Sequence, residues 1–349
     1  MRRTRPTTPV IAGLASAAVL GAVVLMVAGC GEHGSAATVR VGYLPNVAHA
    51  PALVAVHDGL FTRALRGRSR LETRTFNSGP EAVEAIFAGA LDVAYLGPSP
   101  AINAFQKSHG QAVKVISGAA SGGAFFVVQP EISNAADLVG ATVTDPKLGG
   151  SQDVALRTWL AGQGLRTDTS GGGDVVIAPR ENAAALAAFS AKSIAGAWVP
   201  EPWATRLVQE GGGRILVDEA TLWPDHRYPT TVIVAATTFL RAHPSIVTAL
   251  LSANVEAIES IARDPAAARA STNAEIKRVT GRRLSDAVIS SAWNNLDFTS
   301  DPMPMSFQRA AGAAKAAGLL ESTDLNGLFD LGPLNAVLGA SHRTTEPAP

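Results

Sequence analysis

The ten residues Leu91–Pro100, with the sequence LDVAYLGPSP, join a strand to the start of a helix. Leu91–Leu96 is an apolar run of strand length. Gly97-Pro98-Ser99-Pro100 is typical of a helix N-terminus, with Ser99 as the expected cap and Pro100 in the first helical position. Strands that alternate with short helices predict an α/β fold with a mostly parallel sheet and right-handed crossovers.

The residues before this stretch repeat the same order of strand and helix. Val39–Tyr43 and Leu71–Phe76 have the apolar character of strands, and Pro51–His57 has the apolar spacing of a helix. Ser78 lies three residues before Glu81, a spacing that predicts a capping box at the start of a further helix.

A second set of elements follows further along the chain. The expected strands are 141–144, 174–178 and 195–199, and the expected helices are 151–162, 183–189 and 202–208. Gly123–Val128 and Tyr228–Ala236 lie between the two sets and after the second, and both are strand-like. Two such crossings between two α/β lobes predict a hinged clamshell.

This pattern divides the chain into lobes. We expect a discontinuous first lobe at 38–124 and 229–340, and a second lobe at 125–228. The chain is helical and rich in alanine from Pro244 onward, and its apolar stripe should pack on the first lobe. Residues 341–349 are expected to form a disordered tail.

The N-terminus has the layout of a secretory signal that ends at Cys30, the only cysteine of the chain. Three arginines at positions 2, 3 and 5 precede an uncharged stretch, Val10–Val27, and small residues follow. Val27-Ala28-Gly29-Cys30 resembles a bacterial lipobox, which implies a signal peptide at 1–29, a lipid on Cys30 and a tether at 30–37. The alternative is a membrane-spanning anchor, because about 18 apolar residues is near the lower limit for crossing a bilayer.

Composition and charge exclude several functions. Lys+Arg and Asp+Glu each number 29, and removal of the signal leaves 26 basic residues, a net charge near minus three that gives no basic field for nucleic acid. One cysteine excludes an internal disulfide. The seven histidines form no H-x-x-x-H or H-E-x-x-H pair, and no G-x-S-x-G motif occurs, so we expect no metal, no cofactor and no serine hydrolase.

Four spaced segments resemble the solute-binding subunits of ABC importers, in the aliphatic sulfonate, nitrate and taurine group. They are Val41–Asn46 (VGYLPN), Phe76–Glu81 (FNSGPE), Ala94–Ser99 (AYLGPS) and Ala197–Trp203 (AWVPEPW). The likeness runs from about Val39 to Leu320. It implies a monomeric, type II periplasmic-binding-protein-like clamshell outside the cytoplasm, held to the cell membrane by lipid. Such a protein captures a small organic anion, here an aliphatic sulfonate, for a permease and its ATPase.

An anion site follows from helix N-termini at strand ends, where backbone N–H groups lack partners and the helix dipole is positive. Pro98 and Ser99 start such a helix in the first lobe, and Gly149, Gly150, Ser151 and Gln152 do so in the second. The glycines permit close backbone approach, and the side chains add neutral donors. The alternative for Ser99 and Ser151 is simple helix capping.

Six further candidates come from segments at strand ends, and the resemblance implies that the loop with Asn46 and His49 lines the cleft. Asn46 and His49 follow the first strand, and His49 is either a donor to an oxyanion or a bystander. Ser121 and Gly122 precede the first crossing, with a turn as the alternative. Glu201 either selects a cationic or hydroxyl group of the ligand or complements a helix dipole. Trp203 offers a wall for an alkyl tail, whereas Trp198 and Trp159 are expected in the core.

Other functions on the same framework remain open. The ligand could be nitrate, bicarbonate, taurine or a thiamine-precursor pyrimidine, or the chain could be a ligand sensor for a receptor. A pyrimidine-synthesising enzyme of similar fold relies on a cysteine-rich segment and a cofactor lysine. Since the chain has only Cys30, this reading is the weakest, and we do not expect an enzyme.

Overall fold

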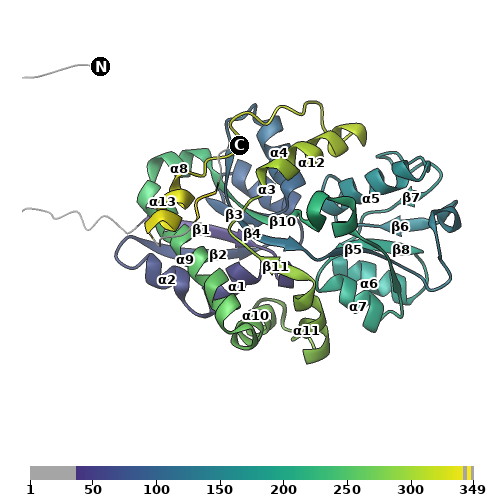
Figure 1. Cartoon of the computed structure of the whole chain (residues 1–349), viewed down its shortest axis with the longest axis horizontal. Helices are drawn as coiled ribbons and strands as arrows, with labels where there is room; N and C mark the ends of the chain where they lie inside the picture. The colour runs from purple at the N-terminus through teal and green to yellow at the C-terminus, as the bar shows by residue number, and fades with distance from the viewer. Residues whose placement is uncertain (1–36, 341–343, 347–349) are drawn as a thin grey trace, which may run out of the picture. The chain divides into compact units, whose positions relative to one another are not determined.

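The computed structural model describes residues 37–340 and 344–346 (Figure 1). The predicted signal peptide 1–29, Cys30 and residues 31–36 of the predicted tether therefore lie outside the described residues, as do 341–343 and 347–349 of the expected tail. Within the described piece of that tail, the backbone N–H of Glu346 donates to Asn335 Oδ1 at 2.8 Å, which joins it to helix α13 (Gly332–Ala340).

The first sheet has six strands in the order β11-β4-β10-β3-β1-β2. Their bounds are β1 Ala37–Tyr43, β2 Ser69–Thr75, β3 Val93–Leu96, β4 Val113–Gly122, β10 Pro229–Ala236 and β11 Leu296–Phe298. β1 pairs in parallel with β2 and β3, whereas β10 runs antiparallel to β3 and β4. The three strands expected from the early sequence are confirmed.

The second sheet has five strands in the order β7-β6-β8-β5-β9. Their bounds are β5 Ala124–Val128, β6 Thr142–Thr144, β7 Val176–Ile177, β8 Gly196–Pro200 and β9 Arg214–Asp218. β6 is parallel to β7 and β8, and β5 is antiparallel to β8 and β9. The expectation of mostly parallel sheets is therefore wrong, because each crossing strand, β5 or β10, enters its sheet antiparallel to its neighbours.

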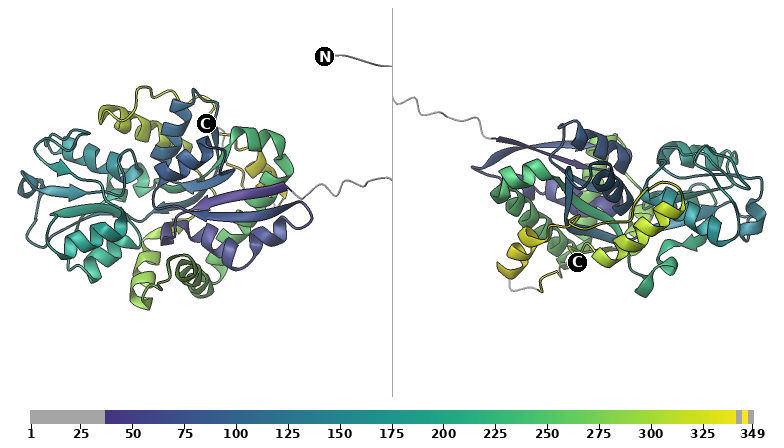
Figure 2. Two further views of the ribbon diagram at one scale, coloured as in Figure 1. Left: turned by 180° about the vertical axis from the view of Figure 1, so that it is seen from behind. Right: turned by 90° about the horizontal axis from the view of Figure 1, so that it is seen from above.

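Helices cover both faces of each sheet (Figures 1 and 2). The helices that precede β10 in the chain are α1 Ala50–His57, α2 Leu60–Ala64, α3 Gly79–Phe87, α4 Pro98–Lys107, α5 Ser151–Gly162, α6 Asn182–Ser190 and α7 Trp203–Gln209. The helices that follow β10 are α8 Thr237–Ala242, α9 Pro244–Arg263, α10 Pro265–Thr280, α11 Asp286–Asn294, α12 Pro304–Ala316 and α13. The result is a mixed α/β fold with a helical C-terminal region.

The C-terminal helices complete the core of the first sheet. Val247, Leu250 and Leu251 of α9 share one buried cluster with Val39 and Val41 of β1. Among the described residues, α9 alone is long and apolar enough to cross a membrane, but half of its apolar window is buried inside the fold. We therefore interpret α9 as a core helix, as the apolar stripe predicted.

The chain passes between the sheets at Gly122-Gly123 and again before Pro229. Both glycines have positive φ, 76° and 72°, and a Cβ on Gly123 would meet Leu296 Cδ2 at 2.4 Å. Glycine is required here because the backbone is left-handed and closely packed. All strands of the second sheet lie between these two passages, and we keep 125–228 as the proposed second lobe.

Several local expectations are corrected by the structure. Helix α4 begins at Pro98, after Gly97, so Ser99 lies in the first turn and is not the cap. The capping box at Ser78 does not form, because the Glu81 carboxylate accepts from the backbone N–H of Asn77 at 3.2 Å. Ser121 and Gly122 lie at the end of β4 and not in a turn.

Candidate ligand-binding site

A small cavity lies where helices from both sheets begin. This central cavity, of about 40 Å³, is lined at the starts of α1, α3 and α4 from the first sheet and of α5 and α6 from the second. The lining residues are Leu44, Asn46, Ala48, His49, Asn77, Ser78, Gly79, Pro80, Gly97, Pro100, Pro146, Lys147, Gly150, Ser151, Gln152, Asn182, Pro200, Thr230 and Thr231.

The five helix starts give the cavity a positive electrostatic character. In each, the preceding residue makes no capping hydrogen bond with its side chain. N–H groups of a first turn have no partner within the helix, and the dipole places partial positive charge there. Each of these helices has at least eight residues, so the arrangement suits an anion.

Neutral polar side chains complete the lining. Asn46 Oδ1, Ser78 Oγ and Asn182 Oδ1 are buried and have no hydrogen-bond partner among the described residues. Buried polar groups normally have partners, so a bound molecule could donate to the two amide oxygens and accept from the Ser78 hydroxyl. Among the described residues that line the cavity, none is Asp or Glu. A cationic group would therefore find no carboxylate in this lining to pair with.

His49 is held neutral in this cavity. Its side chain is almost fully buried, and burial lowers its pKa from 6.5 to about 3. The backbone N–H of Leu44 donates to His49 Nδ1 at 3.4 Å. Since Nδ1 accepts, the ring proton lies on Nε2. His49 can therefore donate a hydrogen bond to an anion without carrying a charge at neutral pH.

Buried acids hold the loop before α5. Asp145 accepts from the backbone N–H of Lys147 at 2.9 Å, and Asp153 accepts from that of Gly149 at 2.8 Å. Asp153 also binds Arg157 Nε at 2.7 Å, and all three side chains are buried. Burial, then the charge of Asp153, raises the pKa of Asp145 well above its usual value. These contacts fix the backbone that leads into Ser151.

Three contacts join the two lobes beside the cavity. The backbone N–H of Ser99 donates to Ser151 Oγ at 3.3 Å. Asn77 Nδ2 donates to Glu181 Oε1 at 3.1 Å. The Lys147 ammonium lies 3.8 Å from Glu81 Oε1. The lobes are therefore closed on each other in this structure.

Five of the residues predicted from sequence line the central cavity, namely Asn46, His49, Gly150, Ser151 and Gln152. Pro98 and Ser99 instead line a neighbouring, mainly apolar cavity of about 70 Å³, which shares Ser151, Gln152 and Thr230 with the central cavity. Gly149 precedes the lining residue Gly150 but is not part of the lining itself.

The structure places the other predicted residues away from the central cavity. Glu201 is buried, and its carboxylate accepts from the backbone and hydroxyl of Thr205 and from Asn295 Nδ2. It therefore caps α7, and burial raises its pKa. Ser121 pairs with Pro229 and Asp297 inside the first sheet, and Gly122 pairs with Leu296.

Trp203 lines a wider groove of about 560 Å³ beside the central cavity. The groove and the cavity share Leu44, Asn46, Asn77 and Asn182, so the two spaces adjoin at these residues. The apolar residues of the groove include Phe76, Leu186, Ile276 and Leu284. Arg206 lies over the Trp203 ring at 4.6 Å. The other two tryptophans discussed above pack in the second lobe, with Trp198 fully buried and Trp159 on Phe126 at 5.4 Å.

Some lining residues escaped the sequence reasoning. Asn182 begins a helix soon after β7. A helix start that follows a strand end identified Ser151, and the same signal could have identified Asn182. Ser78 was interpreted as a cap. Thr230 and Thr231 come from the crossing strand β10, and only the register of the sheet shows that they reach the cavity. Within the described ranges, no group of three or more His, Cys, Asp or Glu side chains could hold a metal ion.

Known structures share this fold. The alkanesulfonate-binding protein SsuA from Xanthomonas axonopodis pv. citri, bound to MOPS, matches with a TM-score of 0.69 and 21% identity over 83% of this chain and 96% of that one. The periplasmic nitrate-binding protein NrtA from Synechocystis matches with a TM-score of 0.70 and 15% identity over 87% and 88%. At these identities the likeness shows the fold alone.

Relatives in sequence point to the same group of proteins. The taurine-binding periplasmic protein of Escherichia coli is 26% identical over 218 residues, which are 62% of this chain and 64% of the relative. A binding protein of Brucella abortus is 27% identical over 197 residues. The chain spans 58% of the length of the Brucella protein, less than two thirds. The NMT1-like family matches residues 32–276, well over half of the sequence, and the chain therefore belongs to this family.

Proposed function

We propose that the protein is the extracytoplasmic solute-binding subunit of an ABC importer, and that it captures a small organic anion between its lobes for a membrane permease and its ATPase. The observation that carries this proposal is the convergence of five helix starts from two sheets on a cavity lined by neutral polar side chains, among them the donors His49 and Ser151, and by Lys147. The relatives that bind taurine and nitrate, and the sulfonate-binding structures of like fold, support it.

The dimensions of the site favour an anion with an organic tail. A cavity of about 40 Å³ holds a compact head group, since one water needs about 10–15 Å³ on this measure. The adjoining groove is more than ten times larger, and its walls are mainly apolar, although Glu181, Arg206, Glu210, Arg282 and Arg283 also line it. We place a sulfonate head in the central cavity and its alkyl tail in the groove. Nitrate and bicarbonate would fill only the first space.

A binding role also explains the chemistry of the site better than catalysis does. A pyrimidine-synthesising enzyme of similar fold needs a cysteine-rich segment, and Cys30 is the only cysteine here. Lys147, the lysine of the cavity lining, is half-exposed beside Glu81. We therefore propose no reaction. A sensor that uses the same site for a receptor is distinguished from an importer by transport assays with the permease.

A thermal-unfolding panel and calorimetry test the proposal directly. A ligand at 100 times its Kd should stabilise the protein by about 2.7 kcal/mol. Across methane-, butane- and hexanesulfonate, affinity should rise by up to about 0.8 kcal/mol per buried methylene. Trp203→Ala should flatten this series while methanesulfonate binds as before. A panel in which nitrate or bicarbonate binds more tightly than every sulfonate would contradict the organic ligand.

We also propose that Cys30 carries the lipid that holds the protein to the membrane. Cys30→Ser should leave the chain uncleaved or release it from the membrane fraction. Mass spectrometry of the mature N-terminus and membrane fractionation measure both outcomes. A Cys30→Ser protein that is processed and membrane-bound like the parent would exclude this anchor.

A further inference from the structure

Three arginines without acidic partners lie where β1 and β2 begin. Arg66, Arg68 and Arg70 are all exposed. Within the described part of the chain, Arg66 and Arg68 make no ion pair, and Arg70 makes only a 3.4 Å hydrogen bond from Nη2 to Thr38 Oγ1. We call these three residues the basic edge, because β2 is the last strand of its sheet.

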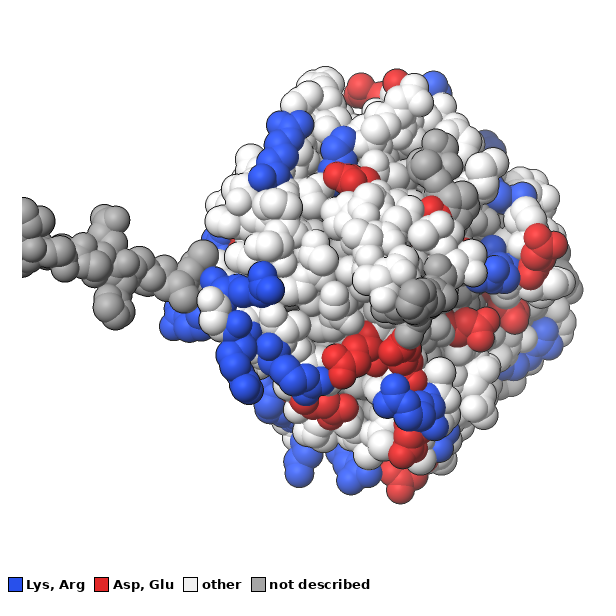
Figure 3. All heavy atoms as spheres, turned by 60° about the vertical axis from the view of Figure 1, so that its left-hand side comes forward, with Lys and Arg blue, Asp and Glu red and all other residues white. Residues whose placement is uncertain are grey.

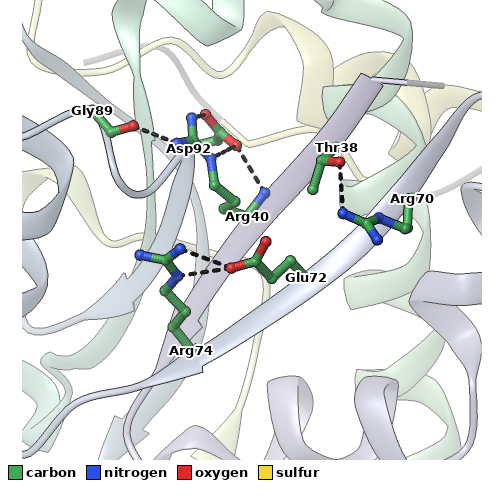
Figure 4. Close-up of polar contacts among 7 residues, drawn as sticks. All are labelled: Thr38, Arg40, Arg70, Glu72, Arg74, Gly89 and Asp92. Atoms are coloured by element: carbon green, nitrogen blue, oxygen red, sulfur yellow. Dashed lines mark hydrogen bonds and ion pairs between the residues drawn. The ribbon is translucent and has the colours of Figure 1, made fainter. Parts of the chain in front are cut away.

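The neighbouring arginines differ from the basic edge because carboxylates neutralise them. Arg40 binds Asp92 at 2.6 Å, and Arg74 binds Glu72 at 2.8 Å (Figure 4). Positive side chains gather on the face drawn in Figure 3. A concentrated, unpaired positive charge stands out in a mature protein that has more acidic than basic residues.

The basic edge lies at the end of the sheet opposite the ligand site. Ser69 pairs with Ala37 and Arg70 with Thr38, at the amino ends of β1 and β2. Leu44, Asn46 and Asn77 of the central cavity follow the carboxyl ends of the same strands. Seven residues of β2 span ~20 Å between the two ends. Contact at the basic edge therefore does not cover the central cavity.

The chain itself brings the basic edge close to a membrane. Six residues lie between Cys30 and Ala37, so seven Cα–Cα steps join the two. A chain of seven steps reaches at most ~25 Å. Ala37 and Ser69 are paired, so a lipid on Cys30 keeps the basic edge within that distance of the bilayer.

We propose that the basic edge binds anionic lipid headgroups of the membrane to which the chain is anchored. This inference rests on the proposed lipid at Cys30. The guanidinium groups hydrogen-bond phosphate oxygens, and clustered basic residues next to an anchor add a second membrane contact. The contact holds the first lobe on the bilayer and leaves the central cavity free to take up ligand.

The test uses the lipid-modified, full-length mature protein in vesicles of phosphatidylcholine alone or of equal parts phosphatidylcholine and phosphatidylglycerol. Hydrogen–deuterium exchange of peptides that cover 63–75 is compared between the two. We expect slower exchange on the anionic vesicles, and loss of the difference at high salt because surface contacts are screened. On anionic vesicles, the double variant Arg66→Gln/Arg68→Gln should lower the ratio of lipid-bound to unbound basic edge by roughly thirty-fold.

A matched control removes the same charge elsewhere. Lys192 and Lys315 are exposed and make no ion pair in the described ranges, so Lys192→Gln/Lys315→Gln should keep the difference in exchange. Equal exchange on both vesicles overturns the proposal and leaves the arginines as protection of an edge strand. Release of the protein from both kinds of vesicle would contradict the lipid anchor at Cys30 and thereby overturn the proposal as well. Calorimetry with the best sulfonate tests the ligand site separately, since both double variants should bind ligand like the parent.

Discussion

The backbone N–H of Ser99 donates to the Oγ of Ser151 at 3.3 Å and joins the first turn of α4 to the first residue of α5. These helices flank different sheets, so one hydroxyl links the lobes at the edge of the central cavity. The Ser151 oxygen accepts this bond, and its hydrogen is free to be donated to an anion. Ser99 takes part with its backbone, whereas its side chain lines the apolar cavity.

This asymmetry predicts different effects for the two serines. Ser151→Ala removes both the lobe contact and a donor, and should weaken anion binding by about 1.5–3 kcal/mol, the range for hydrogen bonds to charged groups. Ser99→Ala keeps the backbone N–H and should weaken it by less than about 0.5 kcal/mol. Calorimetry with the best ligand of the panel measures both. Equal losses for the two variants would contradict this account of the contact.

Gly97 is predicted to control closure of the lobes. Its φ of −76° suits any residue, but a Cβ would lie 2.5 Å from Ser151 Oγ. Gly97→Ala should therefore leave the fold intact, displace the hydroxyl and weaken ligand binding by roughly tenfold, about 1.4 kcal/mol.

Two control variants isolate this effect of Gly97. Gly312→Ala in α12 meets nothing within 4 Å and should bind like the parent. In the Ser151→Ala background, Gly97→Ala should cost less, because the clashing hydroxyl is gone. Full additivity of the two changes in calorimetry would count against the clash as the cause.

The fold was largely predictable because apolar periodicity identifies strands and helices that bury whole faces. Helix Ser151–Gly162 has the expected bounds. The strand Val113–Gly122 was not predicted, since its second half, SGAASG, has small residues without strand character. Its backbone is buried between β10 and β11, and this tertiary pairing, not local propensity, makes it a strand.

The site was predictable only where it follows from strand ends. Ser151 and His49 come directly after strands or begin helices, so topology alone places them in the cleft. Glu201 has the same position, yet Thr205 and Asn295 occupy its carboxylate. A sequence does not show which polar side chains will form hydrogen bonds within the protein at a helix start and so be unavailable to a ligand. Ser78 is the converse case, since it had the pattern of a cap and its hydroxyl is left without a partner in the described structure.

His49 should make folding stability depend on pH. Its folded-state pKa of about 3 lies below its ordinary value of 6.5, so the neutral form stabilises the fold fully above 6.5. This stability should fall by up to about 1.4 kcal/mol per pH unit as pH decreases from 6.5 toward 3. Urea unfolding of the parent and of His49→Gln over this range measures the effect. A slope as steep in His49→Gln as in the parent would assign the effect to other groups.

The acids behind α5 should respond to pH in the opposite direction. The pKa of Asp145 is raised by burial and by Asp153, so its protonated form favours the fold, and this stability is lost as pH rises through the folded-state pKa. Asp145→Asn has no proton to lose at this position, so its stability and anion affinity should lack the decrease that Asp145 gives the parent, whereas the His49 contribution is the same in both proteins. Asp153→Asn is the contrasting variant, because it leaves the buried Arg157 without its 2.7 Å partner and should cost about 3–5 kcal/mol at every pH. Urea unfolding and calorimetry at intervals of about one pH unit between pH 4 and 8 separate the pH-dependent contribution of Asp145 from the constant cost of Asp153→Asn. The parent and Asp145→Asn could instead show the same change of stability and affinity with pH. Asp145 would then keep the same charge throughout, and the loop before Ser151 would not depend on its proton.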